Sequence, residues 1–125
     1  MLDDAAPIFT QIAERLADDI AEGVLAEGDR VPSTNELAAF YRINPATAAK
    51  GINVLTDEGL VEKRRGIGMF VAAGARTQLL DDRRRRFAER FVNPMVAEAA
   101  RLGIDAETLT SMIRESDLAP GGIKV

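Results

Sequence analysis

The stretch RINPATAAKGINVL, residues 42–55, decides the fold of this chain. It contains Asn44-Pro45, a strong helix start, because asparagine caps helices well and proline at the first helical position loses no needed hydrogen bond. A helix over residues 45–58 is therefore predicted. Its core-facing positions recur at the spacing of one helix face and are Ala48, Gly51, Ile52 and Leu55.

The opposite side of this predicted helix carries unusually small side chains. The DNA major groove admits a helix only where the facing side chains permit close approach. A threonine methyl can touch a thymine methyl, and a lysine can reach guanine or a phosphate. The alternative is an ordinary surface helix in which alanine serves helix propensity, but the flanking segments favour the DNA interpretation. The outward positions are Ala46, Thr47, Ala49, Lys50 and Asn53.

The segment before this helix predicts the first half of a helix-turn-helix. STNE, residues 33–36, has the pattern of a capping box, in which the serine and glutamate side chains bond to each other's backbone N–H. It predicts a short helix over residues 33–40, and two helices joined by such a short turn form the helix-turn-helix motif. A further helix is predicted from Pro7 to about Glu22, followed by a short loop, LAEGDRVP. Its buried stripe is Ile8, Ile12, Leu16 and Ile20.

The segment that follows the central helix predicts a β-hairpin with a basic tip. Two short extended runs, LVEK and MFVA, flank the sequence RRGIG at residues 64–68. Gly66 lets the tip turn sharply and lets backbone approach a surface closely. Lys63, Arg64 and Arg65 form either an ordinary charged turn or, as is more frequent beside a helix-turn-helix, a contact with backbone phosphate. These elements together predict a winged helix-turn-helix.

The chain is predicted to be mostly α-helical with one small β-hairpin, in two parts. Residues 1–75 form the winged helix-turn-helix DNA-binding domain, and residues 76–125 form a helical dimerisation region with a loose C-terminal tail. A long helix begins this region, is kinked or restarted at Asn93-Pro94 and ends at Gly103. A last helix follows, with Asp105 as its N-cap.

An apolar stripe on these C-terminal helices predicts the dimer interface. A two-helix appendage cannot enclose a core by itself, so a second copy of the chain is expected to cover the stripe. Part of the stripe could instead line an effector pocket, although such stripes more often pack helix against helix. The run Arg83–Arg86 is expected to be mostly a solvated helix face, because four consecutive residues point all around a helix. The predicted interface residues are Leu80, Phe87, Phe91, Met95 and Leu102.

Composition excludes most enzyme chemistry. The sequence has no cysteine and no histidine, which removes thiolate and imidazole metal ligands and the commonest general base. No glycine-rich phosphate loop stands out, so no enzyme activity and no cofactor are expected. The N-terminus, MLDDAAP, lacks the apolar run of a signal peptide, and no segment approaches the roughly 18 apolar residues of a membrane span. A cytoplasmic protein without membrane contact is therefore expected.

The net charge of −4 hides a strong asymmetry along the chain. Residues 1–41 hold nine acidic and two basic side chains, a balance of −7. Residues 42–86 hold ten basic and five acidic side chains, a balance of +5. DNA affinity depends on neutralising phosphates, and the basic segment supplies the local positive field that this requires.

Residues 7–71 resemble the DNA-binding domain of GntR-family transcription regulators over nearly their whole length. The motifs that carry the resemblance are Pro-Ile-x-x-Gln-Ile, Gly-Asp-Arg-x-Pro-Ser, Glu-Leu-Ala, Asn-Pro-x-Thr, Glu-Gly-Leu-Val and Arg-Arg-Gly-x-Gly-x-Phe-Val. The Asn-Pro-x-Thr variant and a C-terminal part of only about 50 residues resemble the YtrA subfamily, whose members are dimers joined by a short two-helix region.

The resemblance implies a set of DNA-facing positions, which the basic tip extends. Many family members have arginine at the position of Asn35, where it often reads guanine, and larger subfamilies have arginine at the position of Ala49. Base preference therefore does not transfer to this chain. Gly66 at the wing tip is implied to enter the minor groove. The predicted DNA-binding residues are Ser33, Asn35, Asn44, Thr47, Lys50, Arg64, Arg65 and Gly66.

Two functions fit these patterns. The first is a homodimeric transcription regulator, expected to be a repressor, that binds a pseudo-palindromic double-stranded DNA operator. Its release by a small-molecule effector is part of this expectation, and the sequence does not identify the effector. The alternative is a winged helix that serves as a protein–protein interaction module without specific DNA binding. The acidity of residues 1–41 favours the alternative, whereas the placement of Thr47, Lys50 and the basic tip favours the regulator.

Overall fold

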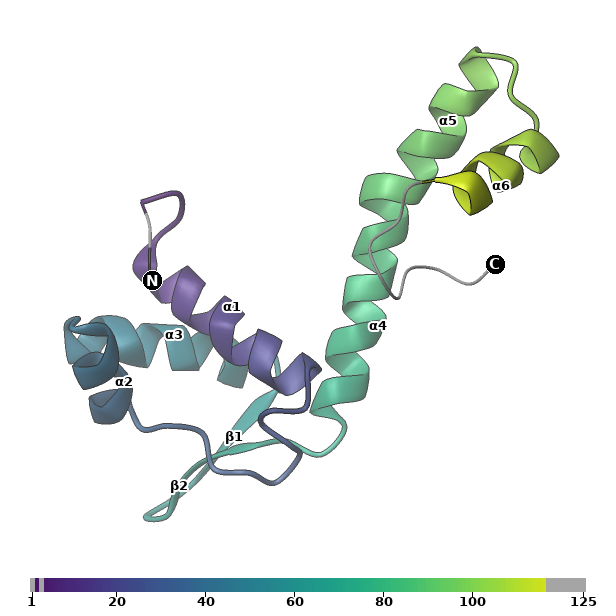
Figure 1. The fold of residues 1–125 in the computed structure, drawn as a ribbon. Helices are drawn as coiled ribbons and strands as arrows, with labels where there is room; N and C mark the ends of the chain where they lie inside the picture. Colours follow the sequence, from purple (N-terminus) through teal and green to yellow (C-terminus); the bar gives the residue numbers. More distant parts are fainter. Residues whose placement is uncertain (1, 3, 117–125) are drawn as a thin grey trace. The chain divides into compact units, whose positions relative to one another are not determined.

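The computed structural model describes Leu2 and residues 4–116, and the expected loose tail at residues 117–125 lies outside them. Contacts divide the chain into a first unit, residues 1–83, and a second unit, residues 84–125. Among the described residues, no helix is both long and apolar enough to span a membrane. The elements in chain order are α1 (Ile8–Ala21), α2 (Thr34–Tyr41), α3 (Pro45–Asp57), β1 (Val61–Arg64), β2 (Gly68–Val71), α4 (Ala75–Phe87), the π-helical turn η1 (Ala88–Val92), α5 (Asn93–Arg101) and α6 (Ala106–Glu115) (Figure 1).

The first three helices begin and end close to where the sequence predicts them. Pro7 precedes α1, and Gly23 follows it with a φ of +81°, the left-handed conformation that glycine adopts without a Cβ penalty. The capping box before α2 is complete. The Glu36 N–H donates to Ser33 Oγ at 3.1 Å, and the Ser33 N–H donates to Glu36 Oε1 at 3.1 Å. Such signals are local in the sequence, so they could be recognised without the tertiary structure.

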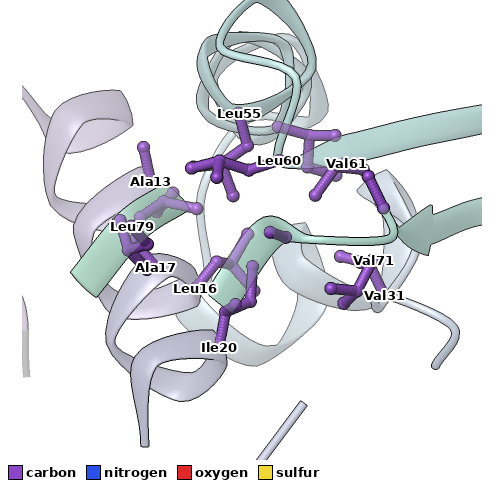
Figure 2. Close-up of a cluster of buried hydrophobic side chains, with 14 of the residues drawn as sticks. Ala13, Leu16, Ala17, Ile20, Val31, Leu55, Leu60, Val61, Val71 and Leu79 are labelled. Carbon is purple, nitrogen blue, oxygen red and sulfur yellow. The ribbon is translucent and has the colours of Figure 1, made fainter. Parts of the chain in front are cut away.

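The core of the first unit lies where α1, α3, the hairpin and the start of α4 meet. Figure 2 shows side chains from these elements pointing toward one another. Ala75 and Leu79 are both buried, so the first turns of α4 complete this core. The sequence analysis predicted a boundary after residue 75 between two independently folding domains, and this boundary stays a prediction. The largest fully buried side chains are Ile12, Ile20, Val31, Leu55, Leu60, Val61 and Val71.

Helix α3 packs closely on α1 because residue 51 is glycine. A Cβ on Gly51 would lie 3.0 Å from Cγ2 of Ile12 and 3.0 Å from the carbonyl oxygen of Phe9, which is backbone and cannot swing away. All four core positions predicted for this helix are buried. The stripe predicted for α1 was wrong at one end. Ile8 is exposed, because the helix begins there and the core covers α1 only from Gln11 onward.

Strands β1 and β2 form the predicted antiparallel hairpin. The loop before α2, expected only as a connection, also pairs with β2. The Val31 N–H donates to the Met69 carbonyl oxygen at 2.8 Å, and Arg30 forms a β-bridge with Phe70. This pairing joins segments that are distant in the sequence, so it leaves no local sequence signal.

The described part of the second unit consists of helices that bury almost nothing among themselves. α4 continues through η1 into α5, and the run ends at Gly103 as predicted. η1 ends two residues before Pro94. Proline has no N–H and clashes with the preceding turn, and the widened turn accommodates it. Asp105 caps α6 by accepting the N–H of Thr108 at 2.8 Å. Within residues 84–116, Ala99 is the only buried residue.

Candidate nucleic-acid interface

A concavity of about 510 Å³ lies between the N-terminal end of α2, one flank of α3 and the hairpin. We call the hairpin with its turn, residues 61–71, the wing, and the concavity the wing groove. Arg30, Asn53 and Lys63 contribute polar side chains to its lining. Half of the predicted DNA-binding residues also line it, namely Ser33, Asn35, Arg64 and Gly66. The other half lie outside its lining, namely Asn44, Thr47, Lys50 and Arg65.

The first turn of α2 presents Ser33 and Asn35 to the wing groove. The Ser33 hydroxyl accepts the Glu36 N–H, so it acts first of all as a helix cap. In return, the backbone N–H of Ser33 and then its hydroxyl hold the pKa of Glu36 below its usual value, and the positive charge of Arg30 acts in the same direction. Asn35 is exposed and has no hydrogen-bond partner in the part of the chain that the structure describes.

Helix α3 borders the wing groove with its small flank. Asn44 Oδ1 accepts the Ala46 N–H at 2.8 Å, so the predicted cap that starts this helix is present. Ala49 and Asn53 then face the wing groove. Because these side chains are short, the backbone of α3 stays near the surface on this flank. This is the geometry that a close approach to another molecule requires.

Thr47 and Lys50 also lie on α3, but neither lines the wing groove. Lys50 Nζ lies 4.2 Å from the centroid of the Phe9 ring, within the range of a cation–π contact. Lys50 is therefore held beside α1, while Ala49 borders the wing. Thr47 is half-buried. The base contacts predicted for these two residues stay predictions.

The wing places its basic residues along the hairpin and at its tip. Arg64 Nη2 lies 3.3 Å from Glu62 Oε1, and its guanidinium lies 4.3 Å from the centroid of the Phe70 ring. Arg65 is exposed in the turn. Gly66 has a φ of +76°, and no atom lies within 4 Å of a Cβ built on it, so the tip is open on that side. Glycine therefore serves both the turn conformation and a close approach by backbone.

Part of the positive charge in residues 42–86 is already paired within the first unit. Arg83 Nη2 lies 2.7 Å from Asp18 Oδ1, and Arg76 donates to the Ala21 carbonyl oxygen at 3.0 Å. These two arginines fasten α4 to α1. The basic residues around the wing groove are therefore the more direct source of a positive field for an anionic partner.

Arg30 is the charged residue lining the wing groove to which the sequence interpretation gave no role. It stands in the motif Gly-Asp-Arg-x-Pro-Ser, within a segment expected only as a loop. The pairing of this segment with β2 brings Arg30 to the base of the wing. The available sequence signals were this motif and a basic residue in a largely acidic stretch.

The second unit exposes most of the predicted interface stripe. Phe87 and Phe91 are exposed, with ring centroids 5.6 Å apart. Leu80 differs from the rest of the stripe, because it is half-buried against the core of the first unit. Two further exposed apolar residues, Val96 and Met112, were not predicted. The exposed set is Phe87, Phe91, Met95, Val96, Leu102 and Met112.

The model of the family described as bacterial regulatory proteins, gntR family, matches residues 9–71, more than half of the chain. The chain belongs to the GntR family. It is 30% identical over 111 residues to the HTH-type transcriptional repressor YtrA of Bacillus subtilis, which covers 89% of this chain and 85% of that protein. It is 29% identical over 108 residues to the HTH-type transcriptional regulator YhcF of the same organism, covering 86% of this chain and 88% of that protein.

Solved structures confirm the winged helix-turn-helix fold of this GntR-family chain. A GntR-family transcriptional regulator of Bacteroides thetaiotaomicron superposes with a TM-score of 0.70 at 32% identity, covering 86% of this chain and 94% of that one. The DNA-binding domain of AraR, solved in complex with operator ORX1, superposes with a TM-score of 0.54 at 26% identity, covering 58% of this chain and 93% of that one. The family and these relatives are transcription regulators and not enzymes.

Proposed function

We propose that this GntR-family protein is a sequence-specific DNA-binding repressor. The observation that carries the proposal is the wing groove, where a helix start, a small helix flank and basic hairpin residues converge from three separate segments. A helix-turn-helix places its second helix in the major groove, which puts the wing beside the adjacent minor groove. Two similar proteins support the proposal, since YtrA is named a repressor and the AraR domain was solved with an operator.

The predicted DNA-binding residues then have different tasks. Ser33 and Asn44 fix the starts of α2 and α3 through their caps. Asn35, Thr47 and Lys50 face base edges. The remaining three belong to the wing, where Arg64 and Arg65 meet phosphates and Gly66 lets the tip enter the minor groove.

The protein acts as a homodimer on a pseudo-palindromic operator. The exposed apolar stripe of the second unit supports this, because a second copy would bury side chains that the described part of one copy leaves in water. Two copies would place two α3 helices in successive major grooves. A small-molecule effector would bind near Phe87, Phe91 and Met95, and the site of action is the cytoplasm, where the operator DNA lies.

A second candidate function is a protein–protein interaction module. A concavity of about 370 Å³ between α1 and α2 is lined by exposed Phe40 and half-buried Tyr41, together with Asp19 and Glu36. Such an acidic and aromatic surface repels DNA and fits a basic protein segment. Salt dependence separates the two functions, because only DNA binding releases counterions in proportion to the phosphates contacted.

The proposed function is tested by selecting duplexes from a random DNA pool with the full chain. A repressor enriches one sequence family with two related half-sites, and the affinity for that duplex falls steeply with salt. An interaction module enriches no sequence. Enrichment of a single unpaired half-site by a monomeric protein would leave specific DNA binding intact and contradict the dimer.

Two variants divide the roles of α3 and the wing on the selected duplex. Lys50→Ala is expected to cost about 1–3 kcal/mol on the selected duplex and less on random DNA, because Lys50 reads bases. Arg64→Ala is expected to weaken both by similar factors and to lower the salt slope by about one unit. If Arg64→Ala instead erases the sequence preference while Lys50→Ala does not, the two roles are reversed.

A further inference from the structure

Arg30 is held at the base of the wing by both backbone and side-chain packing. Its backbone bridges Phe70 of β2. Its guanidinium lies against Gly68, where an added Cβ would be only 3.1 Å from Arg30 Nε. Gly68 has a φ of +141°, which L side chains rarely adopt. The glycine at this position thus leaves the space across β2 in which the guanidinium of Arg30 lies.

The guanidinium of Arg30 acts on the Glu36 carboxylate through its charge, without a direct bond between the two side chains. Among the residues that the structure describes, it takes part in no hydrogen bond or ion pair. This distinguishes it from Arg64, which contacts Glu62 and Phe70, and from Arg83, which is paired with Asp18. Arg30 lines the wing groove together with the first turn of α2. The N–H groups of Thr34 and Asn35 in that turn have no partner within the helix and add donors to the same wall.

The shape of duplex DNA indicates which part of a bound duplex would lie over the wing groove. The sugar–phosphate backbone separates the major groove from the adjacent minor groove. A protein with α3 in one groove and the wing tip in the other therefore has that backbone strand between them, over the wing groove. Phosphate oxygens need several donors, and an arginine guanidinium matches them with two parallel hydrogen bonds.

We propose that Arg30 is a phosphate clamp, which holds the DNA backbone strand that passes between α3 and the wing. The inference rests on the proposed function, because it requires a bound duplex. It adds a fixed contact from the loop before α2, independent of the base readers on α3. Since a phosphate carries no base identity, Arg30 contributes affinity and register but little sequence preference.

The test combines charge removal on the protein with charge removal on the DNA. Binding of the full chain is measured on the selected duplex, on a random duplex, and on selected duplexes in which one phosphate at a time is replaced by an uncharged methylphosphonate. Arg30→Gln is compared with Arg30→Lys, which keeps the charge but loses the two-pronged geometry. Arg114→Gln removes the same charge from an exposed position of α6 outside the predicted interface residues, and it serves as the matched control once sedimentation verifies an unchanged oligomeric state. Thermal melting verifies that each variant is folded.

Arg30→Gln is expected to weaken binding to both duplexes about tenfold, as for the loss of a charged hydrogen bond, and to lower the salt slope by about one unit. With the unchanged protein, the methylphosphonate should produce a comparable loss at one backbone position in each half-site. For Arg30→Gln, a methylphosphonate at that position should cause no further loss of affinity. At the other positions it should weaken binding as much as it does for the unchanged protein. Arg30→Lys should fall between, and Arg114→Gln should match the unchanged protein.

Three outcomes would overturn the clamp while leaving specific DNA binding intact. In the first, Arg30→Gln and the methylphosphonate reduce affinity independently, so that their fold-losses multiply at every backbone position. This result would show that Arg30 contacts no particular phosphate. A loss confined to the selected duplex would make Arg30 a base reader. Full binding by Arg30→Gln would show no contact, with the proposed function untouched. If the unchanged protein enriches no duplex at all, the proposed function fails first and the clamp fails with it.

Discussion

The two units of this chain treat their apolar side chains in opposite ways. In the first unit, Ile12 and Ile20 are 0% exposed, and the core draws on helices, strands and a loop. In residues 84–116 of the second unit, Phe91 is 53% and Leu102 66% exposed, and Ala99 alone is buried. A unit with a closed core needs no partner, whereas an exposed apolar stripe is typical of a surface that another molecule covers. DNA reading and assembly are therefore expected to be separable.

The largest effect should come from removing the second unit. A chain that ends at Arg83 keeps Leu79 and with it the core of the first unit, so it should fold and sediment as a monomer. Its affinity for the selected duplex should fall on the order of 100-fold or more, because the two half-sites lose their linkage. Sedimentation velocity and DNA-binding isotherms measure the two quantities. A truncated chain that still sediments as a dimer would place the interface in the first unit.

Phe91→Glu in the full chain is the control for this truncation. It places a charge in the exposed stripe and leaves the first unit complete. It should reproduce both the monomeric state and the loss of affinity. If it remains a dimer while the truncated chain does not, the interface lies on another face of the second unit.

The next largest effect should be on the free energy of unfolding, and it should differ between substitutions in the two units. Leu55 is 1% exposed, so Leu55→Ala should lower the free energy of unfolding of the first unit by about 2–5 kcal/mol through lost burial and the cavity left behind. Leu102→Ala should change that free energy by less than about 0.5 kcal/mol and should weaken only dimerisation. Urea unfolding at several fixed protein concentrations distinguishes them. Equal destabilisation of the first unit by both variants would contradict the comparison.

A smaller effect is expected where α1 and α3 are in closest contact. Gly51→Ala gains about 0.5–1 kcal/mol of helix preference but forces a methyl against the Phe9 carbonyl oxygen, an overpacking that costs about 1–3 kcal/mol. We expect a net loss of about 1 kcal/mol in urea unfolding. Ala97→Val adds bulk at an exposed position of α5 and should stay within about 0.5 kcal/mol. A stabilised Gly51→Ala protein would mean that the two helices can separate slightly without cost.

The smallest effect should be the pH dependence of stability, to which one capping carboxylate in each unit contributes. The pKa of Glu36 is held below its ordinary value by the Ser33 backbone N–H and then its hydroxyl. The pKa of Asp105 is likewise lowered by the backbone N–H of Thr108 and then its side chain. A lowered folded pKa means stability that is complete above the unfolded value and lost as pH falls through the folded value. Both contributions should therefore be intact at neutral pH and disappear in acid.

Glu36→Gln and Asp105→Asn test this pH dependence, because each keeps a capping side chain and removes its titration. Glu36→Gln should flatten the fall in stability of the first unit in acid, below the ordinary pKa of a glutamate. Asp105→Asn should leave the first unit unchanged and act only on α6, below the ordinary pKa of an aspartate. Circular dichroism during acid unfolding follows both. If Glu36→Gln unfolds in acid as the unchanged protein does, the capping carboxylate does not contribute to the pH dependence of stability.

The order and type of the elements could be predicted because their signals are local. The capping box at residues 33–36, Asn44-Pro45 and Asp105 each start a helix through bonds to residues within one turn. The basic turn at residues 64–68 likewise marks the hairpin. Half of the predicted DNA-binding residues line one concavity because the helix-turn-helix order already places α2, α3 and the wing together.

The site as a whole could not be predicted, because it depends on contacts between distant segments. Arg30 reaches the wing groove only through the pairing of its loop with β2. Lys50 lies over Phe9, a contact that the close packing of α3 on α1 permits. Leu80 continues the apolar stripe in sequence, yet it packs against the core of the first unit.

The sequence by itself determined the helix starts, the hairpin, the family and the separation of a basic segment from an acidic one. Caps, turns and periodicity act over a few residues, so they can be recognised in the sequence. Only the tertiary structure decided which polar side chains share the wing groove and which apolar ones stay exposed. Those outcomes depend on how elements far apart in the chain pack and which atoms they cover, and no local pattern records that.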